Sequence, residues 1–404
     1  MKKLNRWVYV VVGTIVLLFA GLIYAWSVLA SPIAEEFTSW SNAQLSLTFT
    51  IGMTMFCLGG LVGGLCANKI NVKINVWVSA TLFLIGFYLA SKTTTLLGLY
   101  IGFGVLGGFA SGLAYNAVMS TMCKWFPDKQ GLVSGILLMG FGIGSFITGK
   151  VYQAYTPAEI GGWRTSFLVF GIVLFIVLFI GGFFFVKPGE DFVHPDGSRN
   201  TRNKKKFECG IDVNASVMIK RPAFWLFFSW AILLSGAGLS LISQAKGVAI
   251  EIGSQVDGGT IATVVGLISI FNGIGRVVYG GMFDKVGRAK TMFTINMVFI
   301  LSVGVLIVAF ITKSFALIVL GFMCCGFSYG GIPTTSSAFV NAFYGPTHYP
   351  VNFSIINLSL IFASFGSTIS GALYDSSGSY LSTFIVMIGA TIVGLICFFG
   401  IKKP

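Results

Sequence analysis

Long apolar runs separated by short polar segments fill this sequence from end to end. A bilayer core about 30 Å thick needs roughly 20 apolar residues per helix, and the runs have about this length. Gly, Pro and charged residues mark where they begin and end. We expect twelve membrane-spanning helices, at Trp7–Leu29, Leu45–Cys66, Ile74–Ala90, Leu96–Met122, Leu132–Tyr155, Phe167–Val186, Ala223–Ser243, Ile261–Met282, Met292–Ile311, Phe315–Phe339, Val351–Leu373 and Leu381–Ile401.

One long polar segment, Lys187–Arg221, interrupts this pattern after the sixth run. It divides the chain into an N-terminal bundle (1–186), a linker (187–221) and a C-terminal bundle (222–404). The basic cluster around Arg202 and Lys204 is interpreted as a linker held near anionic lipid headgroups, in preference to a binding motif.

The two halves carry a repeated motif. Gly64-x-x-x-Asn68-Lys69 follows the second run, and Gly280-x-x-x-Asp284-Lys285 follows the eighth. The pattern predicts an all-α integral membrane protein with twelve transmembrane helices in two pseudosymmetric six-helix bundles. Carriers built from such repeats bind their cargo at the interface between the repeats, near the middle of the membrane.

Composition narrows the class further. Hydrophobic residues make up 55% of the chain and charged residues 10%, which leaves too little charge for a soluble domain of this size. The seven cysteines and two histidines show no metal-ligand spacing. We therefore expect neither a soluble catalytic domain nor a cofactor or metal.

The formal net charge of +13 reflects orientation in the membrane. Most Lys and Arg residues fall in the N-terminal tail, the C-terminus and alternate loops, and this positive-inside pattern places both termini in the cytoplasm. Nucleic acid is not an expected partner. The opposite loops hold only Lys92, Lys150, Arg164, Lys246 and Lys313. We expect a multi-pass protein of the cell (inner) membrane, whose first run is too long for a cleaved signal.

Arg276 is the candidate functional residue, because it is a cation inside a predicted span. Burying Arg at a helix centre costs about 2.5–3.5 kcal/mol even on insertion scales, and such residues usually serve a function. All Asp and Glu residues fall in loops or at span ends. An Arg without an acidic partner suits a carboxylate, which its forked guanidinium binds through two hydrogen bonds. Asn272, one helical turn away, lies on the same face. The alternative is that Arg276 extends to the membrane surface or pairs with backbone carbonyls.

The segment from Gly280 to Lys290 resembles the G-x-x-x-D-(R/K)-x-G-R-(R/K) signature of the major facilitator superfamily. The resemblance implies a cytoplasmic gate formed by the motif residues. In the first half Asn68 replaces the usual acid, so the charged latch of that half is in doubt. The gating residues implied by the resemblance are Gly280, Asp284, Lys285, Gly287, Arg288, Asn68, Lys69 and Asp128.

Three stretches resemble the oxalate/formate antiporter family, which is related to the monocarboxylate transporters. They are Asn5-Arg6-Trp7 with Tyr24-Ala25-Trp26-Ser27, Lys124-Trp125-Phe126-Pro127-Asp128-Lys129, and Phe271-Asn272-Gly273-Ile274-Gly275-Arg276. The resemblance implies that Tyr24, Tyr115 and Tyr329 line the cavity with Arg276. Asn116 and Asn357 are further candidates for substrate binding.

The eleventh run departs from the family. Oxalate carriers of the family have a Lys there that helps hold the dianion, whereas Val351–Leu373 contains no Lys or Arg, and Leu360 lies near the expected position. A second negative charge would be buried without a partner, which is strongly unfavourable. We therefore expect a small monocarboxylate such as lactate, pyruvate or formate, carried by a monomer through proton-linked symport or anion exchange.

Two other transport functions remain open, an oxalate/formate-type dicarboxylate antiporter and an exporter of lipophilic compounds. An exporter would give Arg276 no clear role. A membrane-embedded enzyme or receptor is disfavoured, because no metal-site motif, catalytic set or ligand-binding loop is visible.

Overall fold

The computed structural model describes the chain except residues 1–4, 41, 68, 187, 189–209 and 403–404. Its described residues form helices joined by short turns, as the apolar runs predict. The elements are α1 (Arg6–Ala20), the 3₁₀ turn η1 (Gly21–Ala25), α2 (Trp26–Leu29), α3 (Ser31–Glu36), α4 (Asn42–Cys66), α5 (Val72–Lys92), α6 (Leu96–Leu99), the π-helical segment η2 (Tyr100–Gly107), α7 (Gly108–Trp125), α8 (Gln130–Tyr155), α9 (Trp163–Gly182), α10 (Ala215–Met218), α11 (Pro222–Ile252), α12 (Gly258–Thr312), α13 (Phe315–Tyr344), α14 (Tyr349–Asn357), α15 (Ser359–Ser377) and α16 (Leu381–Gly400).

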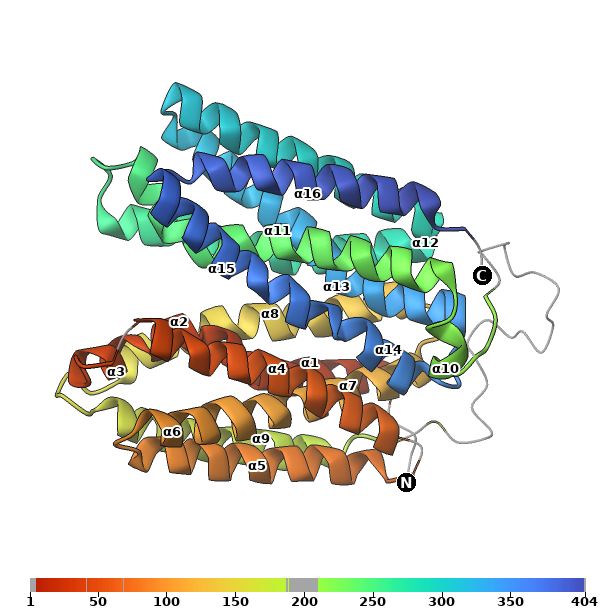
Figure 1. Cartoon of the computed structure of the whole chain (residues 1–404). Coiled ribbons are helices and arrows are strands. Elements are labelled where there is room, and N and C mark those ends of the chain that lie inside the picture. The colour runs from red at the N-terminus through yellow and green to blue at the C-terminus, as the bar shows by residue number, and fades with distance from the viewer. Residues whose placement is uncertain (1–4, 41, 68, 187, 189–209, 403–404) are drawn as a thin grey trace.

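The helices form two layers. Helices α1 to α9 pack mainly against one another in one layer, and α11 to α16 pack in the other. Helices α8 and α12 run side by side across the boundary, and α14 contacts α4 and α7. Both termini lie at the same end of the molecule (Figure 1). This end is called the terminal end below, and the opposite end, which carries Glu36 and Lys92, is called the far end.

Helix α12 holds two of the predicted spans. A straight helix of its 55 residues would be about 80 Å long at 1.5 Å per residue, far more than a bilayer core. It changes direction at Gly287, whose φ of 82° and ψ of 176° are accessible essentially only to glycine. Eleven described helices are apolar and long enough to span a membrane. With α12 crossing twice, they account for the twelve predicted crossings.

Two predicted boundaries were wrong. The polar run between Met282 and Met292 was expected to form a loop, but helical geometry continues on both sides of Gly287. The seventh span was expected to end at Ser243, whereas α11 continues to Ile252. Polar residues in that last stretch, such as Gln244 and Lys246, belong to a helix that extends past the apolar segment.

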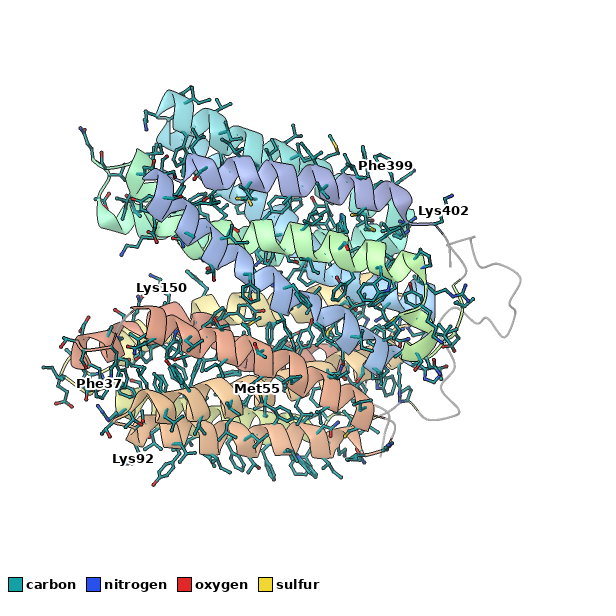
Figure 2. The ribbon with its side chains drawn as sticks, viewed as in Figure 1. Phe37, Met55, Lys92, Lys150, Phe399 and Lys402 are labelled. Carbon is teal, nitrogen blue, oxygen red and sulfur yellow. The ribbon has the colours of Figure 1, made fainter. Side chains whose placement is uncertain are left out.

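The molecular surface is apolar along the sides of the helices. Large side chains such as Phe399 and Ile396 are more than half exposed, as expected for contact with lipid. Figure 2 shows Lys402 at the terminal end, and Lys92 and Lys150 at or near the far end. An apolar belt with charged residues toward its two ends is the surface expected of a protein that spans a lipid bilayer.

Several described spans are irregular near the centre of the molecule. The first tightens into the 3₁₀ turn η1, and the tenth contains Pro333 inside α13. The eleventh breaks at Leu358 between α14 and α15. Interrupted helices free backbone groups and reposition side chains, so they commonly surround the binding sites of transporters.

Candidate functional site

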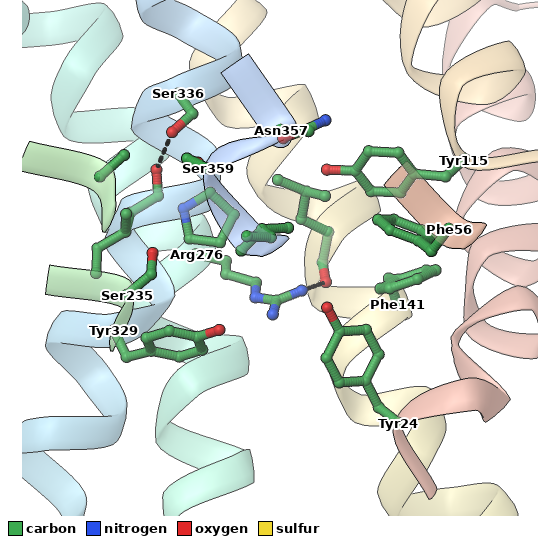
Figure 3. Close-up of a pocket in the computed structure, with 15 residues that line it drawn as sticks. Tyr24, Phe56, Tyr115, Phe141, Ser235, Arg276, Tyr329, Ser336, Asn357 and Ser359 are labelled. Atoms are coloured by element: carbon green, nitrogen blue, oxygen red, sulfur yellow. Dashed lines mark hydrogen bonds between the residues drawn. The ribbon is translucent and has the colours of Figure 1, made fainter. Parts of the chain in front are cut away.

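A cavity lies between the two layers at the level of these irregular segments. Its walls come from both bundles (Figure 3). The space open to the centre of a water-sized sphere is about 30 Å³, enough for roughly two or three waters or one small organic anion. The lining residues are Tyr24, Phe56, Tyr115, Leu138, Phe141, Ala231, Ser235, Arg276, Tyr329, Ile332, Pro333, Ser336, Asn357, Ser359 and Leu360.

Among the described residues that line the cavity, Arg276 supplies the only charged side chain. It is 7% exposed. Its Nε donates to Asn272 Oδ1 at 3.0 Å, and its Nη1 donates to the backbone carbonyl of Leu138 on α8. Among the described residues no carboxylate lies within ion-pair distance of it. Neutral oxygens therefore hold the guanidinium, and no described carboxylate balances its charge.

The direction of the Arg276 side chain excludes extension to the membrane surface. The Arg276 carbonyl lies against the backbone of Gly135, while the guanidinium lies beside Leu138 and Gly142, further along α8 toward the far end. A helical side chain leans toward the start of its own helix, which for α12 is the far end. The other alternative, pairing of Arg276 with a backbone carbonyl, is present in the structure. The carbonyl is that of Leu138, which also lines the cavity.

The N-terminal bundle contributes an aromatic wall opposite this cation. Phe141 packs edge-on against Tyr24 and Tyr115, with ring centroids 5.5 and 5.3 Å away. Phe56 packs against Tyr115 at 5.2 Å. In Figure 3 the hydroxyls of Tyr24, Tyr115 and Tyr329 point toward the space around Arg276. This combination suits an anion with a short carbon skeleton, because the rings offer apolar surface and the hydroxyls offer donors.

Sequence reasoning missed most of the neutral lining residues. Ser235, Ser336 and Ser359 add small polar groups, and Leu138 contributes a carbonyl. The only sequence signal near them is Pro333, which precedes a run of Thr and Ser inside a span. Leu360 lines the cavity, so the position that prompted the monocarboxylate prediction does face the site.

Two predicted asparagines lie outside the cavity lining. Asn272 supports Arg276 from one turn away. Asn116 instead joins the bundles nearer the terminal end, where its Nδ2 donates to Pro350 O at 3.0 Å and to Ser354 Oγ at 2.7 Å. Ser354 in turn donates to Gly60 O at 2.7 Å.

Hydrogen bonds between the bundles gather between the cavity and the terminal end. Ser134 and Ser337 share a hydrogen bond of 2.7 Å across the bundles, and Ser337 shares another of 2.7 Å with Tyr349 of its own bundle. We give the name inner contact to the residues that join the two bundles here, together with Tyr349, which contacts Ser337: Asn116, Ser134, Asp284, Ser337, Tyr349 and Ser354.

Asp284 is the acidic member of the inner contact. Its two carboxylate oxygens accept from the backbone N–H groups of Gly131 and Leu132, both at 2.8 Å. These groups begin α8 in the other bundle, where unpaired N–H groups and the helix dipole favour a negative charge. Gly280 lies against the backbone of Gly131, and Gly64 lies in the same way against Pro350 at the start of α14. The two copies of the motif thus occupy equivalent places.

The remaining motif residues lie around this junction. Gly287 redirects α12 and Lys285 is exposed. Arg288 is buried, lies 5.3 Å from the ring centroid of Phe343, and donates to Ile401 O at 3.3 Å. It therefore holds the C-terminal bundle together, while Asp284 reaches across to the other.

In the first half, two of the three predicted gating residues, Lys69 and Asp128, lie in the described part of the chain. Asn68 lies outside the described residues, and Lys69 is exposed. Asp128 forms a two-pronged ion pair with Arg6, at 2.7 and 3.0 Å. This ion pair joins the start of α1 to the turn before α8, within one bundle.

Comparisons with known proteins agree with this architecture. The chain is 25% identical over 355 residues to an uncharacterized MFS-type transporter, YhjX, of Escherichia coli, covering 88% of this chain and 84% of that protein. It is 26% identical over 350 residues to the oxalate:formate antiporter of Oxalobacter formigenes, covering 85% and 80%. A shorter match, 33% identical over 119 residues, joins it to mouse monocarboxylate transporter 12, covering 30% and 24%.

Solved structures share the fold at low sequence identity. The proton:xylose symporter XylE superposes with a TM-score of 0.73 at 14% identity, covering 99% of this chain and 97% of that one. The transporter FucP in its outward conformation gives 0.68 at 13% identity, covering 98% and 99%. The family model described as Major Facilitator Superfamily matches residues 11–358 and 246–404. With its helical bundles, central cavity and duplicated motif, the chain is a membrane transporter that belongs to the major facilitator superfamily.

Proposed function

We propose that this transporter carries small monocarboxylates of the lactate, pyruvate or formate type by alternating access of its two bundles. The observation that carries the proposal is Arg276, the one cation of the cavity wall, held by neutral oxygens and facing three tyrosine hydroxyls. A carboxylate placed there gains charge-assisted hydrogen bonds in a water-poor site, where they are strong.

A single positive charge favours a monoanion over a dianion. Leu360 lines the cavity near the position at which the related oxalate carriers are expected to have a second cation. The second carboxylate of oxalate would then be desolvated without a partner, and an uncompensated buried charge costs several kcal/mol. The relative from Oxalobacter formigenes supports the alternative, an oxalate/formate-type exchange, and the test below includes it.

The size of the cavity disfavours export of large lipophilic compounds. About 30 Å³ of space for the centres of water-sized spheres suits a molecule of a few heavy atoms. Among the described residues, the lining holds no acidic side chain or histidine. A proton is therefore proposed to move with the carboxylate, or the anion to move by exchange, without a titrating carboxylate in the wall.

Orientation follows from charge. We propose that the terminal end faces the cytoplasm across the inner membrane, because the basic residues concentrate on that side of the chain. The inner contact would then close the cytoplasmic side in this conformation. Both bundles and the cavity belong to one chain, so we propose a monomer in the bilayer as the working unit.

Uptake into proteoliposomes tests the proposal. Labelled lactate, formate and oxalate are offered to wild type, Arg276→Leu and Arg276→Lys, with and without an imposed pH gradient. A charge-assisted hydrogen bond is worth about 1.5–3 kcal/mol, so Arg276→Leu should lose at least about tenfold in monocarboxylate uptake while still inserting. Acceleration by an inward proton gradient indicates symport, and dependence on internal anion indicates exchange.

Lys402→Gln is the matched control, because it removes an exposed cation at the terminal end that lies outside both the cavity and the gating motif. It should transport at close to the wild-type rate. Oxalate uptake as fast as lactate uptake, or undiminished lactate uptake by Arg276→Leu, would contradict the proposal.

A further inference from the structure

Helices α8 and α12 are in backbone contact at Gly135, beside the cavity. The carbonyl of Arg276 lies against the Cα of this glycine, so the two backbones touch there. From this point the Arg276 side chain extends along the surface of α8, in the opposite bundle. Its charged end is thus held by a helix to which it does not belong.

Gly142 forms the floor under that charged end. A Cβ built on Gly142 would lie 3.0 Å from Arg276 Cζ, 3.1 Å from Nη1 and 3.3 Å from Nη2. Carbon atoms in proteins rarely approach so closely, because dispersion contacts are optimal at about 3.5–4.0 Å. Any side chain at this position would displace the guanidinium by a few tenths of an ångström.

The guanidinium has little freedom to give way. Asn272 Oδ1 holds Nε at 3.0 Å, the Leu138 carbonyl holds Nη1, and the side chain is 93% buried. Moving it away from Gly142 moves it away from the Leu138 carbonyl, one helical turn earlier on the same face of α8. It would also move into the space that a ligand must fill.

We propose that Gly142 is the positioning residue for the substrate cation. Its missing side chain leaves a notch on α8 that seats the guanidinium beside the Leu138 carbonyl. The notch sets how far Arg276 extends into the cavity, and hence the size of anion that fits against the aromatic wall. This inference rests on the proposed function, because it assigns Gly142 a role through Arg276.

The notch also couples the two bundles. Because the notch is on α8 and the cation is on α12, an anion on Arg276 contacts a bridge between the two bundles. A ligand that draws the guanidinium off the Leu138 carbonyl loosens this bridge. Substrate binding is thereby linked to the relative position of the two helices that run along the interface.

The test separates positioning from packing. Gly142→Ala should raise the KM for lactate about 3–10-fold, since small displacements of binding groups carry large penalties. Its maximal rate and thermal unfolding midpoint should stay near wild type. The KM for formate should rise less than that for lactate, because the smaller anion tolerates a narrower cavity.

Gly281→Ala is the matched control on the same helix pair. A Cβ there meets only Leu132 Cδ1 at 3.7 Å, an ordinary contact, so its KM should be unchanged. The comparison uses whichever anion of the lactate, formate and oxalate panel the wild type carries fastest. If the wild type shows no preference for monocarboxylates, the proposed function is contradicted. The role of Gly142 can still be measured with the anion that is carried.

Unchanged KM in Gly142→Ala, or an equal change in Gly281→Ala, would overturn the inference, as would a fall in maximal rate at constant KM. If Gly142→Ala accumulates poorly, the same substitution is made together with Arg276→Lys. The crowded guanidinium is then absent, so the double variant should fold as well as Arg276→Lys alone. A double variant that also accumulates poorly would overturn the proposal.

Discussion

At the scale of single residues, the central feature is a buried cation that neutral oxygens hold. Sequence spacing was enough to predict that Arg276 and Asn272 share a helix face, because contacts one turn apart follow from helical periodicity. The other half of the arrangement was not predictable. Leu138 and Gly142 belong to a distant part of the chain, and a carbonyl or a missing side chain leaves no chemical signature in a sequence.

Removing the amide support should weaken binding specifically. In Asn272→Leu the Nε of Arg276 loses its acceptor, and a buried unsatisfied donor costs about 1–3 kcal/mol. We expect the KM for lactate to rise at least about fivefold, with the protein still inserted and monodisperse. Initial-rate uptake in proteoliposomes measures this, and an unchanged KM would show that Asn272 does not support the site.

Glu36, outside the spans, gives a pH dependence at the far end. Arg164 and Trp163 donate to its carboxylate, and these hydrogen bonds, led by that from Arg164, lower the pKa of Glu36 below its ordinary value of 4.5. Because the pKa is lowered on folding, the stabilisation is present above about pH 4.5. It is lost as the pH falls through the lower pKa of the folded protein.

Thermal unfolding in detergent should show this dependence. Glu36→Gln should lower the unfolding midpoint relative to wild type at pH 7, and the difference should shrink as the pH falls below about 4. Asp375→Asn is the comparison. It also removes a carboxylate, but no hydrogen bond like those of Glu36 is described for Asp375. A difference between Glu36→Gln and wild type that is constant with pH would contradict the role given to the carboxylate.

At the scale of helices, apolar periodicity predicted the spans but not how they bend. The break at Leu358, the 3₁₀ turn at Tyr24 and the continuation of α11 to Ile252 each depend on packing between helices. The turn at Gly287 needed a glycine, yet the surrounding charges resembled an ordinary loop. Local composition therefore predicts where the chain leaves the membrane more accurately than it predicts where a helix ends.

The start of α8 is the helix terminus most directly tied to the other bundle. Asp284 accepts from its first N–H groups at 2.8 Å, and a charge in such a place is worth up to about 2 kcal/mol. Asp284→Asn should therefore weaken the inner contact and favour its opening. We expect alkylation of Cys123, which is 3% exposed beside this contact, to accelerate about fivefold.

Lys402→Gln serves as the control, since it alters an exposed charge at the same end of the molecule and leaves the carboxylate in place. Peptide mapping of the alkylated protein reports each cysteine separately. Equal acceleration in both variants, or none in Asp284→Asn, would show that the carboxylate does not hold the bundles together.

At the scale of the whole molecule, the two bundles share a cavity and make polar contacts on one side of it. The duplicated glycine motif predicted two related bundles, and the structure places Gly64 and Gly280 against the starts of α14 and α8. The sequence could not show whether these contacts are closed in a given conformation, because that depends on how two intact bundles tilt.

Two native cysteines report on that tilt. Cys57 is 2% exposed and donates to Asn357 O across the bundles at 3.5 Å, and Cys123 donates to Asn341 Oδ1 at 3.5 Å. If the bundles alternate, saturating lactate should speed alkylation of both from the terminal end at least about threefold. Cys325, buried within the C-terminal bundle, should not change. Equal labelling with and without lactate would contradict alternating access at these contacts.

Arg276 is proposed to be the one charge that holds a monocarboxylate. The most direct measurement is calorimetric titration of lactate and of oxalate into the purified transporter and into its Arg276→Leu variant. We expect lactate to bind to the wild type, oxalate to bind at least about tenfold more weakly, and lactate not to bind measurably to the variant. Lactate binding of equal strength in both proteins would contradict this role of Arg276.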